Sequence, residues 1–142
     1  MPLLEAIAIP KLEPLKVGGS GPLQLAIIGG GPAGLTAAIY AGRSNIPTLI
    51  FEQGAIGGQA ALTDRVENYP GFPGGISGLE LAEKMEMQAK ELGAMITYEK
   101  VEAVSVNNQT LNIKTGNTTY PPKAVIVASG LTRCNRISSW AT

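Results

Sequence analysis

The stretch from Leu25 to Gly34, Leu-Ala-Ile-Ile-Gly-Gly-Gly-Pro-Ala-Gly, joins an apolar run to a turn rich in glycine. An unbroken apolar run is typical of a parallel strand that is covered on both faces. Gly29, Gly31 and Gly34 have the spacing G-x-G-x-x-G, which in α/β units lies between the first strand and the first helix. The stretch therefore predicts a strand, a tight turn, and a helix whose N-terminus binds the pyrophosphate of a dinucleotide.

Each glycine of this turn has its own predicted role, because each omits a Cβ atom from a different crowded place. Gly29 permits the tight turn, and Gly31 lets the backbone approach phosphate oxygens. Gly34 lets the helix pack closely on the first strand. Pro32 stands near the helix start, where its missing N–H group costs little.

A second strand and an acidic residue complete the unit. Residues 48–51, Thr-Leu-Ile-Phe, are predicted to form the strand, and Glu52 follows 23 positions after Gly29. An acid at about this distance accepts hydrogen bonds from ribose hydroxyls, roughly 20 residues beyond the fingerprint. A ribose 2′-phosphate would meet like charge at Glu52, so we expect FAD or NAD rather than NADP. The alternative is a Rossmann-like scaffold that binds no cofactor.

Composition excludes several classes of function. The 142 residues suffice for one domain, and eleven basic and eleven acidic side chains give a net charge of zero. This balance disfavours nucleic acid and anionic membranes as partners. One cysteine and no histidine exclude an internal disulfide and disfavour metal and triad chemistry. We therefore expect no metal site and can assign no catalytic residue.

Residues 1–22 are rich in proline and glycine without periodicity, which predicts a flexible leader. Charged residues and prolines in this segment also interrupt any signal-peptide core, and no apolar stretch is long enough to span a bilayer. We therefore expect a cytoplasmic protein. A long glycine-rich loop is predicted between Glu52 and Ser77. Ser77 and Glu80 fit a capping box for a structural helix that ends at Gly93.

Beyond this helix the hydrophobic pattern changes to a period of two, which predicts a small antiparallel meander. Asn107-Asn108 and Gly116-Asn117 are its predicted turns. The apolar residues 124–128 are predicted to return to the main sheet as a buried strand. The predicted strands of the meander are residues 95–98, 101–106, 111–115 and 118–120.

Four segments in register resemble the FAD domain of the low-molecular-weight thioredoxin reductases, within class II of the pyridine nucleotide-disulfide oxidoreductases. They are Ile27 to Ala41, Gly57-Gly58-Gln59, residues 66–71 (Val-Glu-Asn-Tyr-Pro-Gly) and residues 125–130 (Val-Ile-Val-Ala-Ser-Gly). The resemblance covers residues 23–130, the first segment of that domain. It implies an α/β fold with three layers: a central parallel sheet of the Rossmann-like FAD/NAD(P)-binding type, helices on one face, and a β-meander on the other. The domain would be incomplete at its C-terminal end.

The resemblance also implies a reaction. Family members are dimeric flavoproteins that pass electrons from NADPH through FAD to a cysteine pair in an inserted domain, and then to thioredoxin. For this chain it implies FAD as the cofactor, a homodimer or a complementing chain as the partner, and a thioredoxin-like acceptor.

The resemblance further implies contacts at both ends of FAD. The backbone at Gly30, Gly31, Pro32 and Ala33 would meet the pyrophosphate, and Glu52 would meet the ribose of the adenosine. The amide of Gln59 would face the flavin, and a neutral amide can bond a flavin edge without adding charge. The remaining matched positions are Gly57 and Gly58 beside Gln59, Asn68 facing the flavin, Val101 at the adenine, and the turn Ala128, Ser129 and Gly130 near the cofactor. Asn68 has an alternative role in stabilising the turn before Pro70.

The sequence also departs from the family pattern. It contains no Cys-x-x-Cys and no second glycine fingerprint, and residues 131–142 form a divergent tail. Cys134 in this tail is given no catalytic role. We therefore expect the chain by itself to be inactive as an oxidoreductase, and to expose an open edge or apolar face that favours self-association. The alternatives are a fragment of a ferredoxin or flavodoxin–NADP reductase-like flavoenzyme and a remnant without enzymatic activity.

Overall fold

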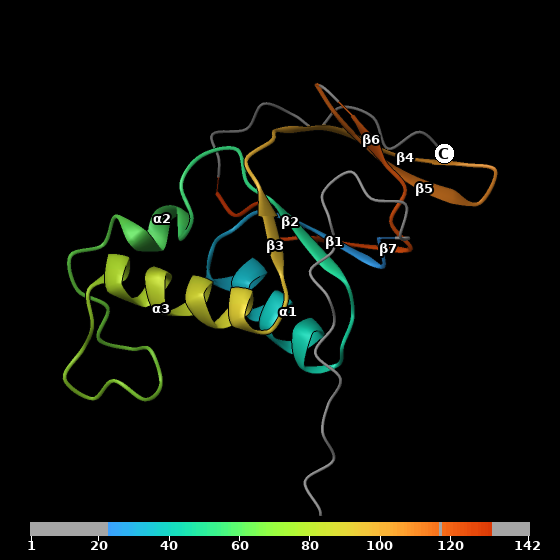
Figure 1. Ribbon diagram of the computed structural model, residues 1–142. Helices are drawn as coiled ribbons and strands as arrows, with labels where there is room; N and C mark the ends of the chain where they lie inside the picture. Colours follow the sequence, from blue (N-terminus) through green and yellow to red (C-terminus); the bar gives the residue numbers. More distant parts are fainter. Residues whose placement is uncertain (1–22, 117, 132–142) are drawn as a thin grey trace, which may run out of the picture.

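The computed structural model describes residues 23–116 and 118–131. Its central layer is a parallel sheet of four strands in the order β3-β2-β1-β7 (Figure 1). The predicted leader, residue Asn117 and residues 132–142, with Cys134, lie outside the described residues. The strands of this sheet are β1 (Leu25–Ile28), β2 (Thr48–Phe51), β3 (Met95–Thr97) and β7 (Ala124–Val127).

Helices α1 (Pro32–Arg43) and α3 (Gly78–Glu91) pack together on one face of this sheet (Figure 1). The predicted helix signals are present: Pro32 begins α1, and the Ser77 hydroxyl accepts a hydrogen bond from Glu80 N at 3.1 Å. Buried side chains from both helices and the sheet form the core between these layers. They include Ile27, Leu35, Ala38, Ile50, Leu81 and Met85.

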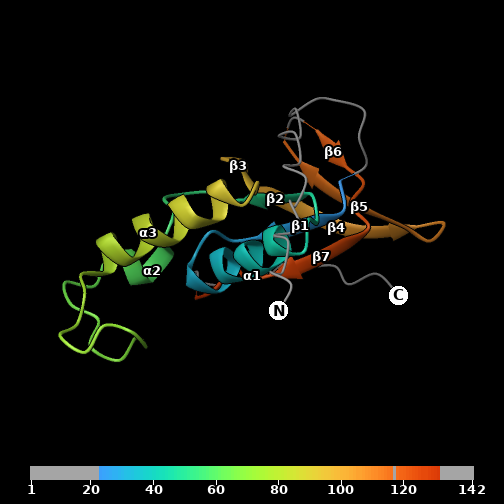
Figure 2. The ribbon, with the colours of Figure 1, turned by 60° about the horizontal axis from the view of Figure 1, so that its bottom comes forward.

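An antiparallel meander covers the opposite face of the sheet, as Figure 2 shows from another side. A second core joins the two layers, with Phe51 of β2 and Ile113 of β5 both buried. The rings of Phe51 and Tyr120 meet edge to face, with centroids 5.0 Å apart. The structure therefore has the predicted three layers. The meander consists of β4 (Val101–Asn107), β5 (Thr110–Thr115) and β6 (Thr119–Tyr120).

The assignment of residues 95–98 to the meander is wrong. Residues Met95–Thr97 form β3, which pairs in parallel with β2 at the edge of the main sheet. Both faces of β3 are covered, with Met95 against the meander core and Ile96 against the helix core. A period of two cannot by itself distinguish these two sheets.

The first hairpin turn lies one residue later than predicted. Asn107 still pairs with Thr110, and the turn is formed by Asn108 and Gln109, whose φ angles are 48° and 63°. Two successive positive φ angles are typical of the type I′ turns that match the twist of a hairpin.

The long loop between Glu52 and Ser77 contains more regular structure than predicted. It includes the short helix α2 (Gly58–Ala61), which begins after Gly57 with φ +94°. Val66 and Ile76 then pair through two backbone hydrogen bonds of 2.7 and 3.0 Å, which closes the intervening segment.

The prediction that residues 124–128 form a buried strand is correct in type but wrong in burial. Strand β7 pairs with β1 through four aligned residue pairs, beginning with Leu25 and Ala124. It lies at the sheet edge of the described part of the chain, where Ile126 and Val127 are 40% and 51% exposed. An apolar run indicates a strand that can be buried on both faces, but its actual burial depends on which elements pack against those faces.

No helix within the described ranges is long and apolar enough to cross a membrane.

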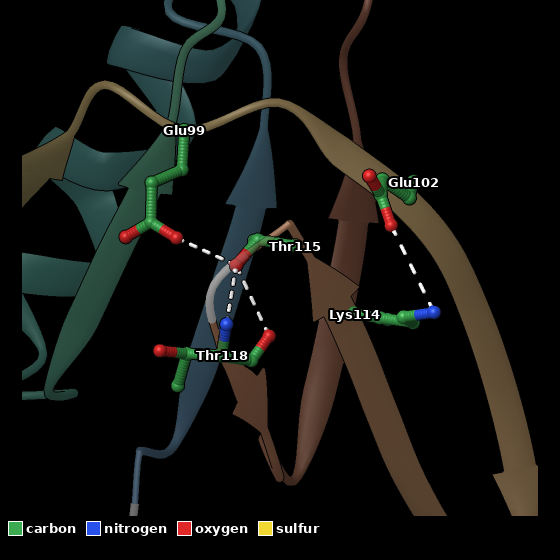
Figure 3. Close-up of polar contacts among 5 residues, drawn as sticks. All are labelled: Glu99, Glu102, Lys114, Thr115 and Thr118. Atoms are coloured by element: carbon green, nitrogen blue, oxygen red, sulfur yellow. Dashed lines mark hydrogen bonds and ion pairs between the residues drawn. The ribbon is translucent and has the colours of Figure 1, made fainter.

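The Glu99 carboxylate connects the two sheets through three hydroxyl groups. Its Oε1 accepts hydrogen bonds from Thr97 at 2.8 Å and Tyr120 at 2.7 Å, and its Oε2 accepts one from Thr115 at 2.6 Å. Figure 3 shows Thr115 between Glu99 and Thr118, whose N–H donates to the Thr115 hydroxyl at 3.1 Å. The hydrogen bonds from Thr115, Tyr120 and Thr97 lower the pKa of Glu99.

We predict that this carboxylate makes the stability of the protein depend on pH. Because its pKa is lower in the folded than in the unfolded state, its contribution is present above the unfolded pKa and is lost as the pH falls through the folded value. The free energy of unfolding, measured by urea titration, should decrease below about pH 4.3, the ordinary pKa of glutamate. Glu99→Gln should flatten this decrease.

Glu102→Gln is the matched control, because Glu102 is exposed and pairs with Lys114 at 3.9 Å. This variant should keep the pH dependence of the wild-type protein. The same decrease in Glu99→Gln as in the wild type would contradict the prediction.

Candidate cofactor site at the ends of the parallel strands

The strand order places a junction between β1 and β7. From β1 the chain first builds the sheet outward through β2 and β3, and it then returns to the other side of β1 as β7. Ligands of open α/β sheets bind at the carboxyl ends of the strands, at the point where the order reverses. The glycine turn after β1 and residues Ala128–Gly130 after β7 both lie at this place.

The glycine turn is closely packed on one side and open on the other. Gly29 has φ +109°, and a Cβ atom on it would overlap the carbonyl oxygen of Ala128. A Cβ atom on Gly34 would overlap the carbonyl oxygen of Gly29 and lie 3.3 Å from Ile27 Cγ2. A Cβ atom on Gly31 would meet no atom within 4 Å. Only Gly31 of this fingerprint therefore faces open space.

The N-terminus of α1 opens onto this space. Gly31 is the N-cap residue and supplies no side-chain cap, and the first helical hydrogen bond runs from Leu35 N to Gly31 O at 2.9 Å. The N–H groups of Ala33 and Gly34 precede this bond, and the first turn contains no acidic residue. Free N–H groups and the positive end of the helix dipole suit an anionic group.

Glu52 holds the outer side of the turn. Its Oε2 accepts a hydrogen bond from Gly30 N at 2.7 Å, and its Oε1 accepts one from Gly54 N at 2.8 Å. The backbone N–H of Glu52 donates to Thr97 O at 3.0 Å. The half-buried carboxylate thus fixes the glycine turn and retains lone pairs for further donors.

The structure brings Gly57 and Gly58 to the same place from the next loop. Gly57 N donates to Gly30 O at 2.8 Å, and the Cβ position of Gly58 lies 3.8 Å from Gly31 Cα. Gln59 follows on α2 with its side chain exposed.

The other predicted residues belong to other elements of the described structure. Asn68 lines an open hollow of about 520 Å³ in the loop between α2 and α3, together with Ala60. Val101 begins β4 and packs against the core around Phe51. Ser129 and Gly130 are exposed after β7.

Sequence reasoning missed two contributors to this site. Ile56 supports the turn from outside, since its Cδ1 would lie 2.5 Å from a Cβ atom on Gly30. Thr97 accepts the backbone hydrogen bond of Glu52. Neither residue belongs to a fingerprint, and only the pairing of β2 with β3 brings Thr97 to Glu52.

Within the described residues, no group of three His, Cys, Asp or Glu side chains is arranged to hold a metal ion.

The fold and the glycine turn define an α/β protein of the dinucleotide-binding class. The family model of the pyridine nucleotide-disulphide oxidoreductases matches residues 23–138, and the chain belongs to this family.

Known thioredoxin reductases are similar to this chain over part of their own length. The thioredoxin reductase of Treponema pallidum is 48% identical over 104 residues, which are 73% of this chain and 34% of that protein. The crystal structure of Lactococcus lactis thioredoxin reductase superposes with a TM-score of 0.72 at 39% identity, over 76% of this chain and 35% of that one. A ferredoxin-flavin thioredoxin reductase from Clostridium acetobutylicum gives 0.72 at 30% identity, over 82% and 40%. The chain thus spans about a third of the length of the thioredoxin reductases.

We predict that a methyl group added at two glycines of the turn has different effects on stability. Gly34→Ala should lower the free energy of unfolding by about 1–3 kcal/mol or more, because the new Cβ overlaps the Gly29 carbonyl oxygen. Gly31→Ala is the matched control and should unfold as the wild type does, because its Cβ enters open space. Urea denaturation followed by circular dichroism measures both, and equal stability of the two variants would contradict this packing.

Proposed function

We propose that this chain is the FAD-binding segment of a thioredoxin reductase-like, NAD(P)H-dependent disulfide oxidoreductase. One observation carries the proposal: the open face of Gly31 at the N-terminus of α1, with Glu52 bound to the same turn. A dinucleotide needs this combination, because its pyrophosphate requires N–H donors and close backbone approach while its ribose requires an acceptor.

The described residues fit the pyrophosphate in a specific way. Gly30 N–H already donates to Glu52, and Pro32 has no N–H group. The donors that remain for phosphate oxygens are the N–H groups of Gly31, Ala33 and Gly34. In this arrangement Gly30 contributes shape to the site, and α1 contributes its hydrogen bonds and dipole.

Glu52 would bind the ribose of the adenosine with its remaining lone pairs. Its negative charge supports FAD over a nucleotide that carries a 2′-phosphate at this position. Gln59 of α2, which follows the two glycines that contact the turn, and Asn68, at the hollow that Ala60 of α2 also lines, would extend the proposed site toward the flavin. Val101 and the turn Ala128–Gly130 would flank the cofactor at the adenine and near the strand ends.

The redox chemistry would belong to the flavin, which accepts a hydride from a nicotinamide and passes electrons to a disulfide. Protein groups of this chain would bind and orient it. The sequence contains a single cysteine, so the reducible cysteine pair of such a reaction would come from a second domain.

The edge at β7 supports a role within a larger assembly. Ile126 and Val127 expose apolar surface there, at an edge whose backbone groups can pair with a further strand. Either a further segment of a longer protein or a second copy of the chain would cover it. The proposal places the protein in the cytosol, where reducing conditions keep thiols available for exchange.

The first prediction from this proposal concerns retained flavin. Purified protein that is mixed with FAD and desalted should keep a structured flavin absorption band, and Gly31→Val should lose it, because the branched side chain fills the space that the phosphates need. Gly74→Val is the control, since Gly74 also has no atom within 4 Å of its Cβ position but lies in the distant loop. A colourless wild-type protein, or a Gly31→Val protein with wild-type flavin content, would overturn the proposal.

The second prediction concerns the adenosine half alone. Glu52→Gln should weaken the binding of ADP by about 1–3 kcal/mol in isothermal titration, because the amide cannot accept hydrogen bonds at both of its terminal atoms. Glu83→Gln, on the exposed face of α3, should bind ADP as the wild type does. Equal affinity of Glu52→Gln and the wild type would show that Glu52 does not contact the ribose.

A further inference from the structure

A continuous series of hydrogen bonds runs from the glycine turn to the meander. Gly30 N donates to the Glu52 carboxylate at 2.7 Å, and Glu52 N donates to Thr97 O at 3.0 Å. The Thr97 hydroxyl then donates to Glu99 Oε1 at 2.8 Å. Each link joins a different strand end, so the turn, β2 and β3 are connected to the segment that leads into β4.

Glu99 is the point at which this series reaches the second sheet. Its two oxygens also accept hydrogen bonds from Thr115 of β5 and Tyr120 of β6. Thr115 is 2% exposed, and Figure 3 shows its hydroxyl directed to the Glu99 carboxylate. Tyr120 is itself held by the edge-to-face contact with Phe51, the residue before Glu52. The carboxylate is thus attached to the meander at two fixed points.

The segment between these attachments joins Thr97, which contacts Glu52, to Val101, the residue proposed to contact the adenine. It leaves the main sheet at Thr97 and enters the meander at Val101, and Glu99 lies halfway between them. Val101 pairs with Thr115, and the register of β4 against β5 shifts between Val101 and Ala103, so Val101 is set apart from the regular pairing of the rest of β4. Glu99 adds a second connection at this point, because its carboxylate accepts a hydrogen bond from Thr115, the residue that pairs with Val101.

We infer that Glu99 is a positioning residue for the adenosine end of the cofactor site, which it acts on by holding Thr97 against Glu52 and by fixing the start of β4 at Val101. The inference rests on the proposed function, because it assigns Glu99 a role in binding the same dinucleotide. Glu99 touches no part of the ligand in this role. It sets the distance between the acid that would bind the ribose and the apolar residue that would contact the adenine.

The charge of Glu99 matters because three hydroxyl donors converge on it. A carboxylate has acceptor sites for all three, and bonds to a charged acceptor are stronger than neutral ones. A glutamine of the same size accepts at only one of its two terminal atoms, so at least one of these hydroxyls would lose its charged acceptor. Glu99→Gln should therefore loosen the segment without removing any volume from the core.

The test uses the complete 142-residue chain and two ligands, FAD and the fluorescent adenine analogue etheno-ADP. Glu99→Gln should raise the Kd of both ligands about tenfold, the loss expected for roughly one hydrogen bond to a charged group. It should also lower the anisotropy of etheno-ADP at saturation, because the bound adenine gains freedom. The anisotropy at saturation reports the adenine itself, which a loss of overall stability well below the unfolding transition would not change.

Two further variants make the result specific. Tyr120→Phe removes one donor to Glu99 but keeps the ring against Phe51, so it should shift Kd and anisotropy in the same direction by less. Glu102→Gln changes the neighbouring exposed carboxylate and should match the wild type in both measurements. If Glu99→Gln is poorly folded by circular dichroism, Tyr120→Phe decides the result.

The outcomes separate the inference from the proposed function. A wild-type protein that binds neither ligand would overturn both. Binding by the wild type with unchanged Kd and anisotropy in the folded Glu99 variant, or in Tyr120→Phe where that variant decides, would overturn the positioning role and leave the proposed function standing. A lower anisotropy in Glu102→Gln equal to that in Glu99→Gln would also overturn it, since the effect would then follow from any charge removed near this sheet.

Discussion

The close approach of three backbone segments at the end of β1 is the constraint on which the site depends. Gly34 of α1 lies against the carbonyl of Gly29, and Gly29 lies against the carbonyl of Ala128 after β7. No side chain fits between these segments, so helix, turn and neighbouring strand meet directly. This contact fixes the start of α1 at the sheet, and it leaves Gly31 facing open space where its N–H donors and those of the first helical turn converge.

Two carboxylates then determine how the surrounding loops sit on this contact. Glu52 accepts hydrogen bonds from Gly30 and Gly54, and Glu99 accepts hydroxyl hydrogen bonds from Thr97, Thr115 and Tyr120. Burial and the Glu99 carboxylate together raise the pKa of Tyr120, so the phenol keeps the proton that it donates. Both acids are therefore part of the framework, and one of them is also a candidate ligand-binding group.

Membership in the pyridine nucleotide-disulphide oxidoreductase family gives these features a context. The chain corresponds to about a third of the length of its thioredoxin reductase relatives, including 34% of the Treponema pallidum protein. The exposed apolar side chains of β7 mark the side of the sheet where the described part of the fold presents an open edge. Cofactor binding, by contrast, would depend on the carboxyl end of β1, where the glycine turn lies.

The sequence by itself determined the strand-turn-helix unit and the cap of α3, because each depends on local spacing between Leu25 and Gly93. The three-layer class followed from the resemblance of four segments to a known family. It did not determine that β3 joins the main sheet, or that β7 is exposed. The spacing of apolar residues indicates which faces of a strand suit burial, but it does not show which element covers them. The spacing of the glycine fingerprint predicted Glu52 as a site residue. The hydrogen bonds that Glu52 makes with Gly30 and Thr97, and the bond between Glu99 and Thr115, join residues that are distant in the sequence. Strand pairing in the main sheet brings Glu52 to Gly30 and Thr97, and the packing of the meander on that sheet brings Thr115 and Tyr120 to Glu99.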